Sequence, residues 1–153
     1  MTLQIATKHR VGLMAPRHVK TLDEVYHKGN IIGPVSQVGG AIIERGSNAN
    51  GEYVRFADGT QICHFHGTVT NQAINSAYGS SGLFIGERTW TFPAQFASGH
   101  IVAFHQGIWG TGASWSTLAS VTTTTANFKF LDVNSRSTGT DFVLNFVAIG
   151  RWF

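Results

Sequence analysis

The C-terminal segment 141–153 limits the fold more than any other part of this chain, because it reads as a β-strand that is apolar on both faces. Successive side chains of a strand point to opposite sides. An antiparallel strand with one solvated face alternates apolar with polar residues, which this segment does not do. A sandwich of this size has one core, so we expect the second face to contact another subunit. The first face holds Phe142, Leu144, Phe146, Ala148 and Trp152, and the second holds Val143, Val147, Ile149 and Phe153.

Short strands separated by turn residues are predicted upstream of this segment. The strongest signal is Asp58-Gly59, which stands between the segments 52–57 and 60–67 and suits a two-residue type I′ turn with positive φ at both positions. Such a turn places Tyr53 opposite His64. Spacing and turn chemistry together favour an all-β protein, built as an antiparallel sandwich. Further strands are expected at 83–85, 90–92, 100–105, 116–123, 128–133 and 142–149.

Two regions precede the predicted sandwich domain, which covers residues 52–153. Residues 1–30 are expected to form a stem or attachment segment with a short helix at 13–28, in which Pro16 fits the first turn. Residues 31–51 are rich in Gly and Asn and predict an extended connector that is not part of the core.

The charge distribution argues against a nucleic-acid partner. The formal net charge of +3 lies within the first thirty residues, and from residue 31 onward basic and acidic residues balance. A nucleic-acid-binding face would need basic residues concentrated on the folded body. Cys63 is the only cysteine, which excludes an intrachain disulfide. No apolar run reaches the length of a membrane span, and the N-terminal residues lack the apolar stretch of a secretory signal. We therefore expect no membrane insertion.

Three stretches resemble bacteriophage tail-fibre and tail proteins. Residues 12–23, GLMAPRHVKTLD, are similar to the GLM-x-x-x-D-K-x-K-L-D segment of fibre stems, although Arg17-His18 replaces the usual acidic-basic pair. Residues 40–63, GAIIERGSNANGEYVRFADGTQIC, resemble a module near fibre C-termini, and TFPAQF at 91–96 with AIGRWF at 148–153 resembles its closing half. The resemblance implies the C-terminal receptor-binding knob of a tail fibre. Such a domain is made in the host cytoplasm, resides in the virion, and joins other tail or fibre proteins through its N-terminal segment.

The second half of the chain, residues 90–153, also resembles the H-type lectin fold. The shared features are an aromatic-Pro-x-x-Phe strand, a Val-Thr-x-x-x-x-Asn-Phe element and a last strand ending in Ala-Ile-Gly. This likeness implies a sandwich of six to seven strands assembled as a homotrimer, with sugar bound between neighbouring subunits.

The pair His64 and His66 is the sharpest chemical feature. The predicted register places both imidazoles with Tyr53, Arg55 and Ile62 on the face away from the core, and places Val54, Phe56, Cys63 and Phe65 on the core face. A threefold axis would gather six imidazoles, and some phage tail spikes and fibres carry His-x-His metal sites there. Imidazole suits Fe, Zn, Cu or Ni, so one ion shared by three chains is one interpretation. The other is a pair of surface histidines that binds no ligand.

Two polar loops are the candidate glycan-binding site. The loop 106–115 carries Trp109 and Trp115 among glycines, and aromatic faces stack on sugar rings. The loop 132–141 carries Asn134 and Arg136 as hydrogen-bonding groups, and the lectin likeness implies that both loops border an intersubunit groove. Alternatively, either tryptophan closes the end of the sandwich.

No arrangement of residues predicts an enzyme. A glycosidase needs two carboxylates facing one cleft, and no spacing in this chain pairs them. We therefore expect no catalytic residues and a tail-fibre tip that binds a host cell-surface polysaccharide during adsorption. The alternatives are a structural trimerisation or capping domain without receptor binding, and a glycan depolymerase. Glycan-array binding separates the first two, and release of reducing ends from polysaccharide detects the third.

Overall fold

The computed structural model describes residues 31–36, 40–97, 100–109, 114–139 and 141–153, and for 107–109 it describes the backbone alone. The predicted stem segment 1–30 and its helix at 13–28 lie outside these ranges. In the described part of the chain, no helix is long and apolar enough to cross a membrane. The described strands are β1 (Ile43–Asn48), β2 (Gly51–Phe56), β3 (Thr60–Val69), β4 (Ser76–Ala77), β5 (Phe84–Thr91), β6 (Val102–Trp109), β7 (Trp115–Val121), β8 (Thr125–Asp132) and β9 (Phe142–Arg151).

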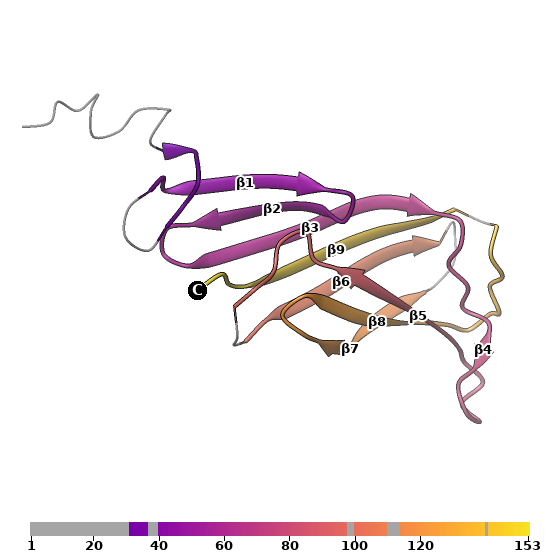
Figure 1. Ribbon diagram of the computed structural model, residues 1–153. Helices are drawn as coiled ribbons and strands as arrows, with labels where there is room; N and C mark the ends of the chain where they lie inside the picture. Colours follow the sequence, from indigo (N-terminus) through magenta and orange to yellow (C-terminus); the bar gives the residue numbers. More distant parts are fainter. Residues whose placement is uncertain (1–30, 37–39, 98–99, 110–113, 140) are drawn as a thin grey trace, which may run out of the picture.

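The strands form two antiparallel sheets, which Figure 1 shows as two layers. The first sheet has five strands in the order β1-β2-β3-β9-β6, and the second has four in the order β4-β5-β8-β7. The predicted all-β antiparallel sandwich is therefore confirmed, but the described residues form nine strands in place of the six to seven that the lectin likeness implied. β6 is an edge strand of the first sheet and β7 is an edge strand of the second. The two strands contact each other, so these edges lie at the same side of the sandwich.

Aromatic side chains fill the space between the two sheets. β8 alternates half-buried with buried residues along its whole length, as expected for a strand with one face on a core. Stacked rings join the sheets: Phe146 of β9 lies 5.0 Å from Phe128 and 5.3 Å from Trp90, measured between ring centroids. Each such ring stabilises the fold by on the order of 2 kcal/mol through burial alone. The core also includes Ile74, Phe92, Phe96, Phe130, Phe142 and Leu144.

β9 lies between β3 and β6 in the five-stranded sheet, and its two apolar faces have different surroundings. The face with Phe142, Leu144 and Phe146 is almost fully buried in the core, as predicted. The opposite face belongs to a surface that no described element covers. We call this surface the outer apolar face. It consists of Val54, Ile62, Val102, Phe104, Val147 and Ile149.

The pairing of β2 with β3 differs by one residue from the predicted register. Arg55 lies opposite Gln61 and Tyr53 lies opposite Cys63, because the turn contains three residues. Gly59 alone has positive φ, at 93°, and its amide donates to the Phe56 carbonyl at 3.0 Å. A three-residue loop with one left-handed Gly is the next most common hairpin connection after the two-residue turn.

Because of this one-residue shift, each β2 side chain lies on the opposite face of the sheet from the predicted one. The prediction that Tyr53 and Arg55 share a face with the histidines is wrong, because both side chains lie on the side of Cys63. Val54 and Phe56, predicted to face the core, lie instead on the side of His64. Cys63 and Phe65 do face the core, as predicted.

The sandwich begins before residue 52, so the predicted connector 31–51 is partly wrong. β1 lies within that range and pairs with β2 along its whole length, from Ile43 opposite Phe56 to Asn48 opposite Gly51. Val35 and Ala41 are buried. The glycines that suggested a connector include Gly51, whose φ of 127° suits the tight turn between the two strands.

β5 joins two segments that were predicted as separate strands. It pairs with β8 without interruption from Phe84 to Thr91, through Gly86. A Cβ atom at Gly86 would collide with the carbonyl oxygen of Ala73. The glycine is therefore needed where the β3–β4 connection passes close to the sheet, and it does not mark a turn.

Candidate functional site

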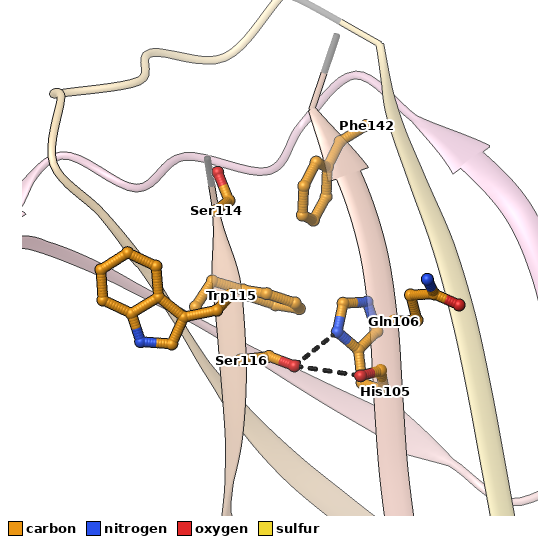
Figure 2. A pocket seen from close by; sticks show the side chains of 7 residues that line it. His105, Gln106, Ser114, Trp115, Ser116 and Phe142 are labelled. Carbon is orange, nitrogen blue, oxygen red and sulfur yellow. Dashed lines mark hydrogen bonds between the residues drawn. The ribbon is translucent and has the colours of Figure 1, made fainter. Parts of the chain in front are cut away.

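A pocket of about 320 Å³ lies between the edge strands β6 and β7 (Figure 2). It opens near the loops that were predicted to bind a glycan. His105 and Gln106 come from β6, and Ser116 comes from β7. The full lining consists of His105, Gln106, Ser114, Trp115, Ser116, Phe130 and Phe142.

The imidazole of His105 forms the inner wall of the pocket. Its ring lies 4.7 Å from Phe130 and 4.8 Å from Phe146 between centroids. Its Nδ1 atom lies 2.8 Å from the Oγ atom of Ser116, which also donates to the main-chain oxygen of His105 at 3.2 Å. Both hydrogen bonds can form at once when Nδ1 of His105 carries the proton and donates it to the Ser116 Oγ atom. Desolvation lowers the pKa of His105 to about 4, so this ring is neutral at neutral pH.

The Trp115 side chain does not enter the pocket. Figure 2 shows its indole on the opposite side of β7 from His105. Trp115 lies opposite Leu131 of β8 and is 46% exposed. The alternative that Trp115 closes the end of the sandwich is therefore wrong, and the ring is an accessible aromatic surface beside the pocket. Trp109 ends β6 opposite Phe142, and its side chain lies outside the described residues.

A buried carboxylate organises the loop after β8. Asp132 is fully buried and accepts hydrogen bonds from the Ser114 hydroxyl, from the Asn134 amide at 2.8 Å and from Arg136 Nε at 3.0 Å. Burial alone would raise the pKa of Asp132, but these donors and the Arg136 charge hold it below its usual value. Asp132 thereby connects the start of β7 to the 133–139 loop.

Arg136 makes structural contacts that the sequence did not predict. Its main chain exchanges two hydrogen bonds of 2.9 Å with Ile74, and its guanidinium pairs with Asp132. The side chain remains 24% exposed. Asn134 is exposed in the same loop. The structure therefore brings Asn134 and Arg136 together, and places them one strand away from Trp115.

Sequence reasoning did not include His105 or Ser116 among the site residues. His105 occupies a core-facing position of β6, opposite Phe146 of β9, where an apolar residue is usual. The available signal was the alternation of Val102 and Phe104 with Ala103 and His105, which places the histidine on the inner face. The polar partner of His105 depends on how the two sheets pack together, and no local sequence pattern predicts that packing.

His64 and His66 lie on the outer side of β3 and are exposed. His64 Nε2 lies 3.7 Å from Glu52 Oε2, and His66 Nδ1 lies 2.6 Å from the amide oxygen of Asn145. Within the described ranges of one chain, no group of three or more His, Cys, Asp or Glu side chains could hold a metal ion. A metal shared by several chains stays a prediction.

No family model matches this chain, and no curated protein matches it. Among solved structures, it is similar to the C-terminal part of the P. aeruginosa R1 pyocin fibre, with 20% sequence identity and a TM-score of 0.47. The match covers 74% of this chain and 29% of that one, so the chain spans less than a third of the length of the pyocin fibre structure.

Proposed function

We propose that this chain is a tail-fibre-like tip that binds a glycan on a host cell surface through the region around Trp115. The observation that carries the proposal is the half-exposed indole of Trp115 beside a pocket with polar walls. An aromatic face stacks on the apolar face of a sugar ring, while hydroxyl and amide groups select its hydroxyl pattern. Gln106, Ser114 and Asn134 supply such groups within the same region.

The scaffold suits this role because the site stands on two neighbouring edge strands, one from each sheet. The His105–Ser116 hydrogen bond and the Asp132 network hold the strand ends in place. Binding costs less when the groups that contact the ligand are already ordered. A shallow site of this kind binds one sugar weakly, and several copies on one particle raise the overall binding.

We infer that the working form is a homotrimer that uses the outer apolar face. Val102 is 62% exposed, Phe104 51% and Ile149 40%, and they adjoin one another across β6 and β9. Contiguous exposed apolar side chains mark protein contact surfaces. His64 lies in the same cross-strand row as Val147 and Phe104, so a trimer built on this face would bring histidines of several chains together. One Fe, Zn or Ni ion bound by His64 and His66 of three chains follows as a proposal.

The tail-fibre resemblance of residues 12–23 and 40–63 supports the biological setting. In this proposal, the N-terminal segment joins other virion tail or fibre proteins, and the domain acts at the fibre tip. Partners are other copies of the chain and host polysaccharide, without nucleic acid or membrane insertion.

A structural trimerisation or capping domain is the second candidate, and the outer apolar face favours it equally. A depolymerase is the third. Against it, Asp132 is buried in an ion pair and Glu87 lies 3.6 Å from Lys129, so neither carboxylate is placed as a general acid.

A glycan array of bacterial polysaccharides, probed with the full chain, separates these functions. We expect binding to a restricted set of glycans, with no reducing ends released during long incubation. A protein that assembles but binds none of the glycans would favour the capping function, and released reducing ends would favour the enzyme.

A further inference from the structure

A second hollow, of about 210 Å³, lies at the opposite pair of sheet edges from the His105 pocket. It is formed between the β1–β2 turn and β5, and we call it the Arg88 groove. Beyond Ile85, which pairs with β4, β5 is the edge of its sheet. The groove is lined by Ala49, Asn50, Phe65, Arg88, Thr89, Trp90, Thr91 and Phe146.

Arg88 points inward from β5, on the same face as the buried Trp90 and opposite the buried Phe128. Its Nη1 atom donates to the side-chain oxygens of Asn71 at 3.2 Å and Gln72 at 3.3 Å. The Gln72 amide is oriented by its own hydrogen bond of 2.8 Å to the Ala73 carbonyl. These acceptors are neutral.

The charge of Arg88 is therefore not compensated by an acid. In the described part of the chain, Arg55, Lys129 and Arg136 each lie within 4.0 Å of a carboxylate, and Arg88 does not. Arg45 and Arg151 also lack such a partner, but both are exposed to water. Arg88 is half-buried, and desolvation lowers the pKa of its guanidinium. A partly desolvated cation gains more from an arriving anion than a hydrated one does.

The walls of the groove favour a sugar as the carrier of that anion. Trp90 and Phe146 stack at the base, and the Trp90 indole donates to the Asn50 carbonyl at 2.8 Å. Thr89, Thr91 and Asn50 carry hydroxyl and amide groups at the rim. Guanidinium groups bind carboxylate and phosphate oxygens in pairs of parallel hydrogen bonds.

We propose that the Arg88 groove binds the anionic group of an acidic sugar, either a uronic acid carboxylate or a sugar phosphate. The sugar class rests on the proposed glycan function, while the anion preference follows from Arg88 itself. The groove is separate from the region around Trp115, so either site can fail without the other.

The test is a titration of the full chain with D-glucuronate, glucose 6-phosphate and glucose, observed by NMR at the Trp90 indole N–H. We expect millimolar saturation with one or both anions and none with glucose, and the stronger anion identifies the ligand class. Arg88→Gln should lose saturation, Arg88→Lys should weaken it about tenfold because the planar fork is lost, and Arg45→Gln and Trp115→Ala should leave it unchanged.

Two results would overturn the proposal. One is wild-type protein that responds equally to glucose or to no sugar at all. The other is anion binding that persists in Arg88→Gln. An inward-pointing charge on an edge strand can also prevent edge-to-edge association of sheets. If Arg88→Gln aggregates and the wild-type protein binds no anion, the role of Arg88 is to prevent this association. If the glycan array shows no binding to neutral glycans but the titration still shows anion binding at the Arg88 groove, only the proposed Trp115 site is rejected.

Discussion

The Nδ1 atom of His105 lies 2.8 Å from the Oγ atom of Ser116, and this hydrogen bond joins the edge strands of the two sheets. The pair is placed at the end of the sandwich where the candidate loops begin and end. The stability of this pair therefore bears on both the fold and the site.

Acid should destabilise the fold through His105. Desolvation lowers its folded pKa from 6.5 to about 4, so between these pH values the unfolded chain binds a proton that the folded chain does not. The free energy of unfolding should fall as the pH drops from about 6.5 to about 4. After allowance for partial solvent exposure, we expect a loss on the order of 2 kcal/mol. Urea unfolding at several pH values measures it.

His105→Phe provides the control, because a phenyl ring suits the surrounding Phe side chains and does not titrate. Asp132 is present in both proteins, and its lowered pKa places its effect at more acidic pH. The same pH dependence in both proteins between pH 6.5 and 4 would show that His105 is not the group responsible.

Arg136→Gln should destabilise the protein by about 2 to 3 kcal/mol, because it leaves the buried Asp132 carboxylate without its cation. Arg45→Gln, at an exposed arginine without an ion pair in the described structure, should change stability by less than about 0.5 kcal/mol. Thermal unfolding compares the two. Equal melting temperatures for the two variants would mean that Arg136 does not stabilise the fold and that its role is confined to ligand binding.

The outer apolar face should hold the trimer together. Phe104→Asp places a charge at a half-exposed position of that face, where it leaves the monomer core intact but is costly in an interface. Light scattering should give three times the chain mass of 16.6 kDa for the wild type and one chain mass for the variant. Thr117→Asp, at an exposed position of β7, is the matched control and should stay trimeric. A trimeric Phe104→Asp protein would place the interface elsewhere.

Protein purified without chelator should contain about one metal ion per three chains if His64 and His66 form a shared site. His66→Ala should lose the metal, while His100→Ala, at another exposed histidine, should keep it. Elemental analysis gives the ratio. A metal-free wild-type trimer whose melting temperature is unchanged by chelator would leave the two histidines as ordinary surface residues.

The sheet architecture was accessible from sequence because it depends on local alternation and turns. The buried face of β9 and most strand positions followed from the pattern of apolar residues. The register of β2 with β3 did not, because Asp58-Gly59 suits loops of two and of three residues, and a one-residue change reverses every side chain. β1 was missed because its Gly, Ser and Asn residues match a connector, while its pairing with β2 makes it a strand.

The candidate site was only partly predictable for a related reason. Trp115 and Asn134 are recognisable from sequence as exposed residues with binding chemistry, although Trp115 begins β7 and only Asn134 lies in a loop. Arg136 pairs with Asp132 only four residues away, but the sequence did not predict that this carboxylate is buried. The role of His105 depends on Ser116, which reaches it only after the two sheets have packed together. Contacts between distant segments of this kind leave no periodic trace in the sequence.

The affinity of Trp115→Ala for a glycan that the wild-type chain binds tests the central claim most directly. Tyr78→Ala is the matched control, because Tyr78 is an aromatic residue of similar exposure, 48%, and directly follows β4, at the opposite edge of the four-stranded sheet from β7. Calorimetry should show at least about tenfold weaker binding for Trp115→Ala and none of this loss for Tyr78→Ala, with oligomeric state and melting temperature preserved in both. Wild-type affinity in Trp115→Ala would contradict the proposed site.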